Sequence, residues 1–444
     1  MCASPLFTDL YELTMAQAYY AESMDQLAVF ELAFRRLPHD RNFLVAAGFA
    51  DVLDFLTAFH FTTNDLDYLR SRREFSEEFL GCLGSLKFSG DVYAVPEGTI
   101  VFPNEPLLQV IAPIMEAQLI ETFVLNQIHF QSIATTKATR VVAAAEGRAI
   151  IDFGSRRAHG TDAALKVARA TYLSGGAGTS NVLAGKLYGI PVFGTMAHSY
   201  IQAHDDEAAS FESFAELYPE TTLLVDTYST LDGVRKVVEL SQRLGRRFRV
   251  RSLRLDSGDL GALAFQTRKM LDNAGLHNVQ IFASSGLDEY KVQELIKSGA
   301  PIDAFGVGTK LAVSADAPEL DMAYKLVEYA GKGRLKLSRK KLLYPGRKQI
   351  FRQTENGTML SDVIGRFDEP LPGERLLKPI MINGRPTARI ELEESRKRLH
   401  GELELLPEHL RVLDSATPPY PVAYSQLLHG DLHSIRLKLG LAEA

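Results

Sequence analysis

The chain has 444 residues, 46% hydrophobic and 23% charged, which is typical of a soluble globular enzyme large enough for two or three domains. Its 49 basic and 55 acidic residues leave a net charge of −6, which is too small and too evenly spread to indicate a nucleic-acid surface. The two cysteines, Cys2 and Cys82, form no CxxC pair, which argues against structural zinc and for a reducing compartment. Because no stretch resembles a signal peptide or reaches the roughly 20 apolar residues of a membrane span, we expect a cytoplasmic protein.

Residues 1–115 predict an α+β domain. Thr8 or Asp9 can cap a first helix, with Glu12 in the position that a capping box requires, and apolar residues follow at helical spacing. Short β-type runs such as "DVYAVPEGTIVF" then flank helical ones such as "VAAGFADVLDFLTAF". A long helical stretch, at 115–146, leads into the next region.

Residues 116–345 alternate buried runs with amphipathic helices. Six runs end in Gly, Ser, Thr or Asp: "RAIIDFGSRR", "IPVFGTMAHS", "TTLLVDTYST", "RSLRLDSGDL", "NVQIFASSG" and "IDAFGVGTK". The helix "TSNVLAGKLYG" has Thr179 or Ser180 as its cap and Gly189 as its end, and "DLGALAFQTRKMLDNAG" ends at Gly275. This alternation predicts a parallel sheet and favours a β/α barrel over an open sheet. We expect the C-terminal segment, 346–444, to pack back on the N-terminal domain.

Chemistry in a β/α barrel lies in the loops that follow the strands. Glycine-rich loops, arginines, carboxylates and a histidine follow different runs at that same end: Asp152, Phe153, Arg156, Arg157, His159, Thr195, His198, Asp226, Arg254, Asp256, Asp259 and the glycines of "FASSG" and "FGVGTK". Backbone N–H groups and arginines bind phosphate, and aspartates suit Mg²⁺ or ribose hydroxyls. The residues alone therefore indicate an enzyme acting on a phosphorylated sugar or nucleotide, although each one can instead be a helix cap or a surface charge.

Eight motifs together resemble the nicotinate phosphoribosyltransferases, from about residue 6 to the C-terminal tail. They are "TDLYELTMAQAYY", "FELAFRR", "DFGSRRAHG", "GGAGTSNVLAGKLYGIPVFGTMAHSY", "LLVDTYSTLDGV", "RLDSGDLGALAFQTRKMLDNAG", "IDAFGVGTKLAVSADAPELDMAYKLVEYAG" and "YPGRKQIFR". The resemblance implies an α/β fold of the type II phosphoribosyltransferase kind, an irregular β/α barrel with an additional α+β domain.

The resemblance also implies a reaction, in which the enzyme serves as both ligase and glycosyltransferase. Nicotinate, 5-phosphoribosyl 1-pyrophosphate, ATP and water give nicotinate mononucleotide, pyrophosphate, ADP and phosphate, which is a salvage route to NAD. The implied cofactor is Mg²⁺, ATP is a co-substrate, and the implied assembly is a homodimer with a shared active site and no nucleic-acid or membrane partner.

The catalytic roles carry over by position. His198 of "GTMAHS" matches the histidine that the family phosphorylates from ATP, although a histidine near an apolar run can also be purely structural. Asp226, Arg254 and Asp256 match residues around the ribose, Mg²⁺ and pyrophosphate. No side chain is expected to ligate the metal directly, and Asp226 and Asp256 are expected to reach it through water.

The substrate-binding roles follow the same resemblance. Tyr11, arriving from the partner subunit, and Phe153 match the aromatic pair around the pyridine ring, and Arg156 matches the residue that reads its carboxylate. Ser180 stands where relatives that use nicotinamide carry an aspartate, so it favours nicotinate; its alternative role is a helix cap. Thr195 is a further substrate-binding position, and the loops that hold the 5-phosphate match Gly286, Gly306, Gly308 and Thr309. Three basic residues resemble further phosphate contacts, although each can equally be a surface charge: Arg35, Lys348 and Lys325.

Two departures and four rival interpretations stand beside this one. His159 occupies a position where many relatives have glutamine, and Ala177 one where a bulkier residue is usual. A nicotinamide phosphoribosyltransferase is disfavoured by Ser180, and a quinolinate phosphoribosyltransferase is shorter and needs no histidine phosphorylation. A catalytically silent relative would have lost His198, Asp226 or Arg254. A different barrel enzyme, an isomerase or aldolase, would need a lysine or carboxylate base that we do not find.

Overall fold

The computed structural model describes residues 4–336 and 343–440. Two compact units divide the chain: residues 1–133 with 319–444 form the first, and residues 134–318 form the second. The domain limits at 115 and 345 stay a prediction. Among the described residues, no helix combines the length and the apolar character that crossing a membrane requires.

The first unit is built on a seven-stranded sheet with strand order β13-β12-β1-β5-β3-β17-β18, in which every pair is antiparallel. Its strands are β1 (Leu27–Phe34), β3 (Asp91–Ala94), β5 (Pro106–Pro113), β12 (Met322–Tyr329), β13 (Lys332–Gly333), β17 (Lys378–Ile382) and β18 (Arg385–Pro386). The smaller sheets are β16-β14-β15-β19 and β2-β4, made of β2 (Leu44–Val45), β4 (Ile100–Val101), β14 (Lys348–Glu355), β15 (Thr358–Arg366), β16 (Glu374–Arg375) and β19 (Val422–Tyr424).

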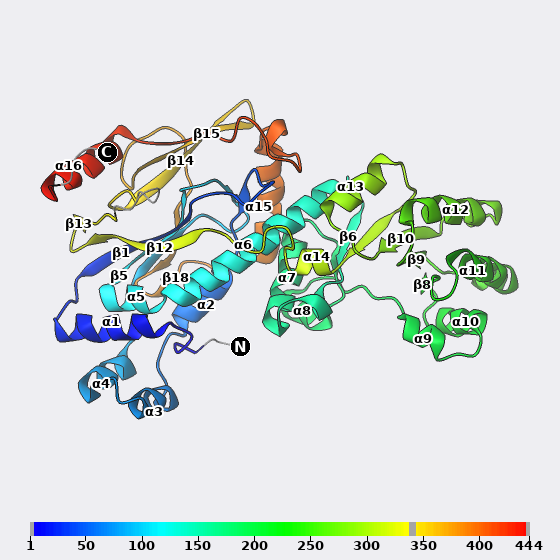
Figure 1. Cartoon of the computed structure of the whole chain (residues 1–444), viewed down its shortest axis with the longest axis horizontal. Coiled ribbons are helices and arrows are strands. Elements are labelled where there is room, and N and C mark those ends of the chain that lie inside the picture. The colour runs from blue at the N-terminus through cyan, green and yellow to red at the C-terminus, as the bar shows by residue number, and fades with distance from the viewer. Residues whose placement is uncertain (1–3, 337–342, 441–444) are drawn as a thin grey trace. The chain divides into compact units, whose positions relative to one another are not determined.

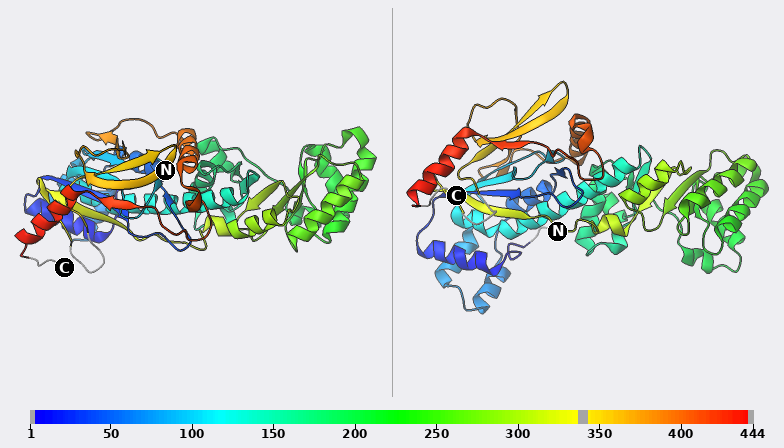
Figure 2. Two further views of the ribbon diagram at one scale, coloured as in Figure 1. Left: turned by 90° about the horizontal axis from the view of Figure 1, so that it is seen from above. Right: turned by 45° about the horizontal axis from the view of Figure 1, so that its top comes forward.

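Helices α1 to α5 of the first unit lie on one side of the seven-stranded sheet, and β14 and β15 lie on the other, where α16 packs against β15 (Figures 1 and 2). The helices of this unit are α1 (Leu10–Ala21), α2 (Phe49–Thr57), α3 (Thr63–Ser71), α4 (Glu77–Ser85), α5 (Ile114–Leu119), the start of α6 (Glu121–Ala144), α15 (Leu392–Leu405), the short η3 (Glu408–Leu410) and α16 (Gln426–Lys438). The long helix expected at 115–146 is thus interrupted at Ile120, between α5 and α6.

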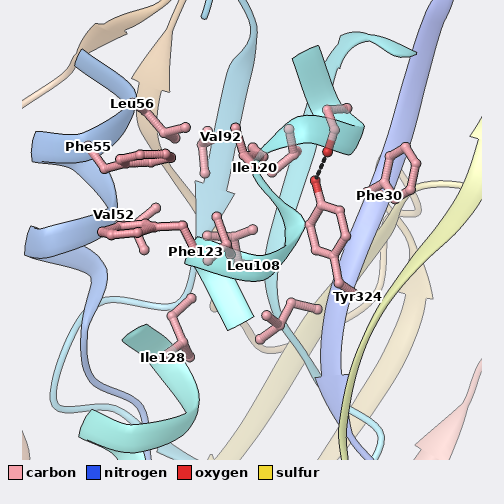
Figure 3. Close-up of a cluster of buried hydrophobic side chains, with 14 of the residues drawn as sticks. Phe30, Val52, Phe55, Leu56, Val92, Leu108, Ile120, Phe123, Ile128 and Tyr324 are labelled. Carbon is pink, nitrogen blue, oxygen red and sulfur yellow. Dashed lines mark hydrogen bonds between the residues drawn. The ribbon is translucent and has the colours of Figure 1, made fainter. Parts of the chain in front are cut away.

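Aromatic rings fill the core between these helices and the sheet (Figure 3). Phe55 of α2 stacks on Phe123 of α6 with ring centroids 3.9 Å apart, and Phe30 of β1 stacks on Tyr324 of β12 at 4.9 Å. The hydroxyl of Tyr324 donates to the Ala117 carbonyl at 2.8 Å, so its polar end is satisfied inside the core.

The first helix forms as predicted, but the capping box does not. Asp9 is the N-cap residue and its side chain makes no capping bond. Glu12 is buried instead: it accepts from the Thr8 hydroxyl at 2.6 Å and from the Thr122 N–H at 3.1 Å. Burial raises the pKa of Glu12, and the bonds from Thr122 and Thr8 oppose this shift. The carboxylate therefore joins α1 to α6 rather than closing its own helix.

The second unit is a curled sheet of six parallel strands with helices packed around it (Figure 1). The strand order is β7-β6-β11-β10-β9-β8, from β6 (Ala149–Asp152), β7 (Gly178–Thr179), β8 (Thr222–Leu224), β9 (Ser252–Leu255), β10 (Gln280–Ser284) and β11 (Ala304–Val307). The connecting helices are η1 (Ser155–Arg157), α7 (Thr161–Leu173), α8 (Val182–Tyr188), α9 (His198–Gln202), α10 (Glu207–Leu217), α11 (Thr230–Leu244), η2 (Gly245–Arg247), α12 (Leu260–Asn273), α13 (Glu289–Lys297) and α14 (Thr309–Ala312).

The predicted barrel is present but open along one seam. The first and last strands, β6 and β11, pair as barrel closure requires, whereas β7 and β8 are the two edges of the sheet. The strand expected at 190–194 reduces to a single parallel bridge between Val192 and Thr179. Gly178 makes this approach possible, because an added Cβ there would lie 2.2 Å from the Pro191 carbonyl oxygen. The fold is therefore the expected irregular β/α barrel with an additional α+β domain.

The predicted ends of two helices in this unit hold, and one predicted cap is wrong. Gly189 (φ 69°) ends α8, and Gly275 (φ 73°) follows α12. The cap of α8 is Asn181, whose side chain accepts from the Ala184 N–H at 3.1 Å, and not Thr179 or Ser180. The Thr179 hydroxyl is already committed to Asp152.

A buried acidic cluster in the first unit surrounds one arginine. Arg352 donates to Asp362 (2.7 Å) and to Glu402 (2.8 Å), and Tyr420 donates to Asp362 at 2.9 Å. Burial raises the pKa of Glu105 well above its usual range. Charge repulsion from Asp362 and a hydrogen bond to the Asp362 carboxylate raise this pKa further. The positive charge of Arg352 and the hydrogen bond from the Phe102 N–H lower it and so oppose the shift. Glu105 therefore keeps its proton to a higher pH in the folded chain than an exposed carboxyl group does.

We predict that Glu105→Gln flattens the pH dependence of stability. Folding raises the pKa of Glu105, so wild-type stability is full below the ordinary carboxyl pKa and falls by up to about 1.4 kcal/mol per pH unit as pH rises toward the raised pKa. Urea unfolding between pH 4 and 8 should show that the free energy of unfolding of the variant increases relative to that of the wild type as pH rises. Glu355→Gln, on the exposed end of β14, is the control. Parallel curves for all three proteins would contradict the assignment.

Candidate active site

Arg254, near the end of β9, is the centre of the polar cluster at the carboxyl edge of the six-stranded sheet. Its side chain is buried, and Nε donates to Ser284 Oγ of β10 at 2.8 Å. One terminal nitrogen donates to Thr195 Oγ1 at 3.2 Å, and the other pairs with Asp256 Oδ1 at 3.0 Å. The guanidinium thus brings together loops that are separate in the sequence, and charge-assisted bonds hold its plane in one orientation.

An aromatic ring lies over this cation. The guanidinium carbon of Arg254 lies 5.3 Å from the ring centroid of Phe153, whose other ring neighbour is Phe282 at 5.4 Å. Gly306 makes room for the ring, because an added Cβ would lie 2.7 Å from it. The predicted phosphate-loop glycine therefore also has a steric role beside the predicted pyridine site.

Two aspartates follow β8 and β9. Asp226 Oδ2 accepts from the Asp256 N–H at 2.9 Å and from the Ser257 hydroxyl at 2.6 Å. Asp226 Oδ1 is buried and has no hydrogen-bond partner within the described part of the chain. Leaving such an oxygen unpaired costs on the order of 1–3 kcal/mol, so this atom is a candidate to accept from a ligand. Asp256 itself accepts from Ser284 at 2.5 Å as well as from Arg254.

His198 begins α9, in the segment that runs along the open seam of the sheet. Its Nδ1 shares a hydrogen bond of 3.1 Å with Thr227 Oγ1, and its Nε2 lies 3.6 Å from Asp256 Oδ2. The side chain is 41% exposed. Thr227 therefore orients the imidazole ring through Nδ1. Among the described residues, the only polar neighbour of Nε2 is Asp256 at 3.6 Å, so this nitrogen faces the Arg254 cluster on a side chain that stays partly exposed.

Asp152 supports two of the predicted substrate-binding loops, a role that the sequence did not reveal. Its carboxylate is fully buried and accepts from the Gly154 N–H and the Thr179 hydroxyl, both at 2.7 Å, and its carbonyl accepts from the Ser180 N–H at 2.8 Å. Burial raises the pKa of Asp152, and the bonds from Thr179 and Gly154 oppose this shift. Since Asn181 caps α8, the alternative role of Ser180 as the cap is wrong, and its side chain makes no capping bond.

The predicted phosphate loops follow β10 and β11. Ser285 (φ 91°) and Gly286 (φ 59°) turn the first loop through left-handed backbone, and both residues are exposed. Gly308 precedes α14 in the second loop, with Thr309 exposed as the first residue of that short helix. Arg156 lies on the exposed η1 and His159 is also exposed, and in the described part of the chain neither forms a hydrogen bond or an ion pair with the Arg254 cluster.

Four of the predicted substrate-binding residues belong to the first unit: Tyr11, Arg35, Lys348 and Lys325. Tyr11 is 45% exposed on α1, and burial of its hydroxyl end together with nearby carboxylates, Glu121 foremost, raises its pKa. Arg35 pairs with Asp321 at 2.8 Å. Lys325 donates to a backbone carbonyl at 2.8 Å. Their roles in substrate binding stay predictions.

Lys348 is buried rather than exposed to solvent. Its ammonium lies 3.0 Å from Glu31 Oε2 and donates to the carbonyls of Tyr344 (2.7 Å) and Gly346 (3.0 Å). These three contacts occupy its three hydrogens. A phosphate contact by Lys348 would therefore require one of them to be replaced.

The curled parallel sheet and the cluster of strand-end residues define a phosphoribosyltransferase of type II. Two family models match: the nicotinate phosphoribosyltransferase N-terminal domain over residues 6–129 and the nicotinate phosphoribosyltransferase family over residues 149–343. The chain is 59% identical over 437 residues to nicotinate phosphoribosyltransferase pncB2 of Mycobacterium tuberculosis, covering 97% of this chain and 94% of that protein. It is 41% identical over 383 residues to nicotinate phosphoribosyltransferase of Bacillus subtilis, covering 84% and 78%.

The structural comparison agrees. The crystal structure of human nicotinic acid phosphoribosyltransferase superposes with a TM-score of 0.86 at 30% identity, covering 96% of this chain and 99% of that one. The nicotinate-nucleotide pyrophosphorylase of Pyrococcus furiosus follows with a TM-score of 0.74 at 28% identity, covering 90% and 95%. The chain belongs to the nicotinate phosphoribosyltransferase family.

We predict that Asp152→Asn lowers the free energy of unfolding by about 1–3 kcal/mol. An amide has one acceptor oxygen, so either the Gly154 N–H or the Thr179 hydroxyl would be left unpaired in a buried position. Asp205→Asn, an exposed change in the same unit, should stay within about 0.5 kcal/mol of the wild type. Urea unfolding compares the three proteins, and equal values for both variants would show that Asp152 does not support these loops.

Proposed function

We propose that this chain transfers the phosphoribosyl group of 5-phosphoribosyl 1-pyrophosphate to nicotinate and so supplies nicotinate mononucleotide for NAD synthesis. The observation that carries the proposal is the cluster around Arg254, in a chain whose similar relatives bear the name nicotinate phosphoribosyltransferase. A buried cation, two aspartates, a histidine and two glycine loops at one sheet edge suit a substrate with three phosphoryl groups and a ribose.

The transfer breaks the bond between ribose C1 and the pyrophosphate oxygen and forms a bond from C1 to the pyridine nitrogen. Positive charge develops at C1 and negative charge grows on the leaving pyrophosphate, so a fixed cation beside that group lowers the barrier. Arg254 supplies this charge, because its neighbours already hold it in place and little reorganisation is needed. The partnerless oxygen of Asp226 is suited to accept from a ribose hydroxyl or a metal-bound water.

The aspartates fit the expected Mg²⁺ through water. Asp226 has one buried oxygen to spare, and Asp256 is tied to Arg254 and Ser284, which suits outer-sphere contact better than direct ligation. Mg²⁺, when bound, would neutralise charge on the pyrophosphate.

The pyridine ring is assigned to the loops that Asp152 supports. Phe153 offers a ring face, Arg156 a guanidinium for the carboxylate, and Ser180 a hydroxyl that is not used in capping α8. Tyr11 of a second copy would cover the other face of the pyridine. The exposed apolar side chains of α8 support a homodimer, since Val182 is 73% exposed and Leu183 and Leu187 are also exposed.

His198 is assigned as the residue that couples the reaction to ATP. Its Nε2 would attack the terminal phosphorus of ATP, releasing ADP, and water would later cleave the P–N bond to give phosphate. The hydrogen bond between Nδ1 and Thr227 supports this role because it orients the ring while leaving Nε2 accessible. The two cysteines of the sequence, Cys2 and Cys82, form no pair close in sequence, which supports action in a reducing compartment such as the cytoplasm.

Product formation tests the proposal. Purified protein with 5-phosphoribosyl 1-pyrophosphate and Mg²⁺ should form mononucleotide from nicotinate, and ATP should increase the yield with matching release of ADP. Mononucleotide from nicotinamide instead would refute the assigned substrate, and no product from either pyridine would favour the silent-relative interpretation.

We predict that His198→Ala abolishes ADP release during turnover while slow, ATP-independent synthesis remains, because the bond-making cluster around Arg254 is intact. His204→Ala, six residues further along the chain at a histidine whose ring is hydrogen-bonded to the Tyr200 carbonyl, should keep full ATP dependence. Radiolabel transferred from ATP should appear on the wild type and the control. An alanine variant at 198 that still responds to ATP would remove the phosphohistidine assignment.

We predict that Ser180→Asp shifts the ratio of kcat/KM from nicotinate toward nicotinamide by about 10²-fold or more, because a carboxylate repels nicotinate and accepts from an amide. Ser180→Ala removes the hydroxyl without adding charge and should weaken nicotinate use by roughly tenfold without favouring the amide. The two pyridines are assayed side by side for each protein. A ratio that is the same in all three would exclude Ser180 from specificity.

A further inference from the structure

A buried ion cluster lies within the second unit, outside the residues assigned so far. The ammonium of Lys137, on α6, is fully buried and pairs with the fully buried carboxylate of Glu289 and with Asp316 Oδ1 at 2.6 Å. The other Glu289 oxygen accepts from Arg140 Nε at 2.9 Å, and Arg140 also donates to the Tyr290 hydroxyl at 3.0 Å. Two positive and two negative side chains therefore meet here, and all of them except Asp316 are buried.

The partners of Lys137 come from the two candidate phosphate loops. Glu289 is the first residue of α13 and directly follows the loop after β10 that contains Gly286. Asp316 lies shortly beyond α14, whose N-terminus is the loop after β11 that contains Gly308. One ammonium thus connects the trailing ends of both loops.

A second contact joins the same loops nearer the sheet edge. Lys310 Nζ, on α14, lies 3.5 Å from Asp288 Oδ2, and Asp288 also caps α13 by accepting from the Lys291 N–H at 2.9 Å. Ser285 holds a left-handed φ of 91°, which is unfavourable for a residue with a side chain and persists only when its surroundings impose it. Asp288 and its neighbour Glu289 therefore both tie the C-terminal end of the loop after β10 to residues of other elements.

Buried ion pairs are seldom net stabilising, because the desolvation of two charges offsets their attraction. Their attested benefit is that they specify one arrangement of the elements they join. Here the joined elements are the two loops whose backbone N–H groups would cradle a phosphate, and an anion site depends on their spacing.

We propose that Lys137 is a positioning residue, which through Glu289 and Asp316 holds the loops after β10 and β11 at the spacing that binds the 5-phosphate of the phosphoribosyl substrate. This inference rests on the proposed function for the identity of the substrate. Lys137 does not touch the substrate in this account and acts only through the two loops.

The test measures phosphate affinity directly. Ribose 5-phosphate binding is measured by calorimetry, and KM for 5-phosphoribosyl 1-pyrophosphate, KM for nicotinate, kcat and the unfolding midpoint are measured in parallel. Lys137→Met should raise the Kd for ribose 5-phosphate and the KM for the pyrophosphate substrate by about tenfold or more, with KM for nicotinate within about twofold. A purely structural role would lower the stability and the active fraction of the protein, but it would not raise the Kd for ribose 5-phosphate and the KM for the pyrophosphate substrate selectively over the KM for nicotinate.

Matched variants keep the outcome decisive. Asp316→Asn removes one partner that is 34% exposed, so it should fold and show the same selective effect even if Lys137→Met does not fold. Lys137→Met with Asp316→Asn removes one positive and one negative charge together and leaves Glu289 paired with Arg140, so it should weaken phosphate binding with a smaller loss of stability than Lys137→Met alone. Lys236→Met breaks the pair with the buried Glu207 between α10 and α11 and should leave both phosphate parameters unchanged.

Three results would overturn the proposal: wild-type affinity for ribose 5-phosphate in the Lys137 and Asp316 variants, an equal loss in Lys236→Met, or no binding of ribose 5-phosphate by the wild type. The proposed function fails separately, if the wild type binds ribose 5-phosphate but makes no mononucleotide from nicotinate.

Discussion

The candidate site depends on one buried guanidinium. Arg254 lies at the carboxyl edge of a parallel sheet, where its charge is desolvated and its polar contacts are with Ser284 at the end of β10, Thr195 and Asp256. A buried cation is tolerable only if such partners surround it, so Ser284, Thr195 and Asp256 must occupy their positions for the unit to fold. The same contacts leave the cation oriented toward the loops that would hold pyrophosphate. The contacts that stabilise the buried charge of Arg254 are therefore the same contacts that would orient this charge for catalysis.

The open seam explains the location of the histidine. A closed barrel would place a strand at 190–194 between β7 and β8, and its backbone would be held by hydrogen bonds on both sides. Here the segment follows only β7, through Val192 and Thr179, so the chain from Gly194 onward is free to bring His198 beside Thr227 and Asp256. A phosphoryl group on His198 would add negative charge next to Asp256 and so perturb the pairing of Asp256 with Arg254. This geometry gives a physical route by which ATP can alter the affinity for the second substrate.

The sequence predicted the elements whose signals are local, and it missed those that depend on distant partners. Five of the six apolar runs form strands, and Gly189 and Gly275 follow their helices, because burial and backbone chirality act over a few residues. The run at 190–194 failed as a strand although its composition matches the others, since its pairing is decided by the rest of the sheet. Lys348 lies in a basic stretch of the sequence, where a surface position is expected, but in the folded chain it is buried and pairs with Glu31, which lies far away in the sequence. Asp152 begins the motif "DFGSRRAHG" and Lys137 lies in none of the quoted motifs, and only the folded chain shows that each of them joins two loops.

The central claim is that Arg254 stabilises charge that develops on pyrophosphate in the transition state, and a single-turnover measurement with Arg254→Lys tests it most directly. Lysine keeps the charge but cannot reproduce the bonds to Ser284, Thr195 and Asp256 together. We expect mononucleotide formation from bound nicotinate and 5-phosphoribosyl 1-pyrophosphate to slow by roughly 10²–10³-fold, with nicotinate affinity little changed. A single-turnover rate within about threefold of the wild type would contradict the account and move the catalytic charge to another residue.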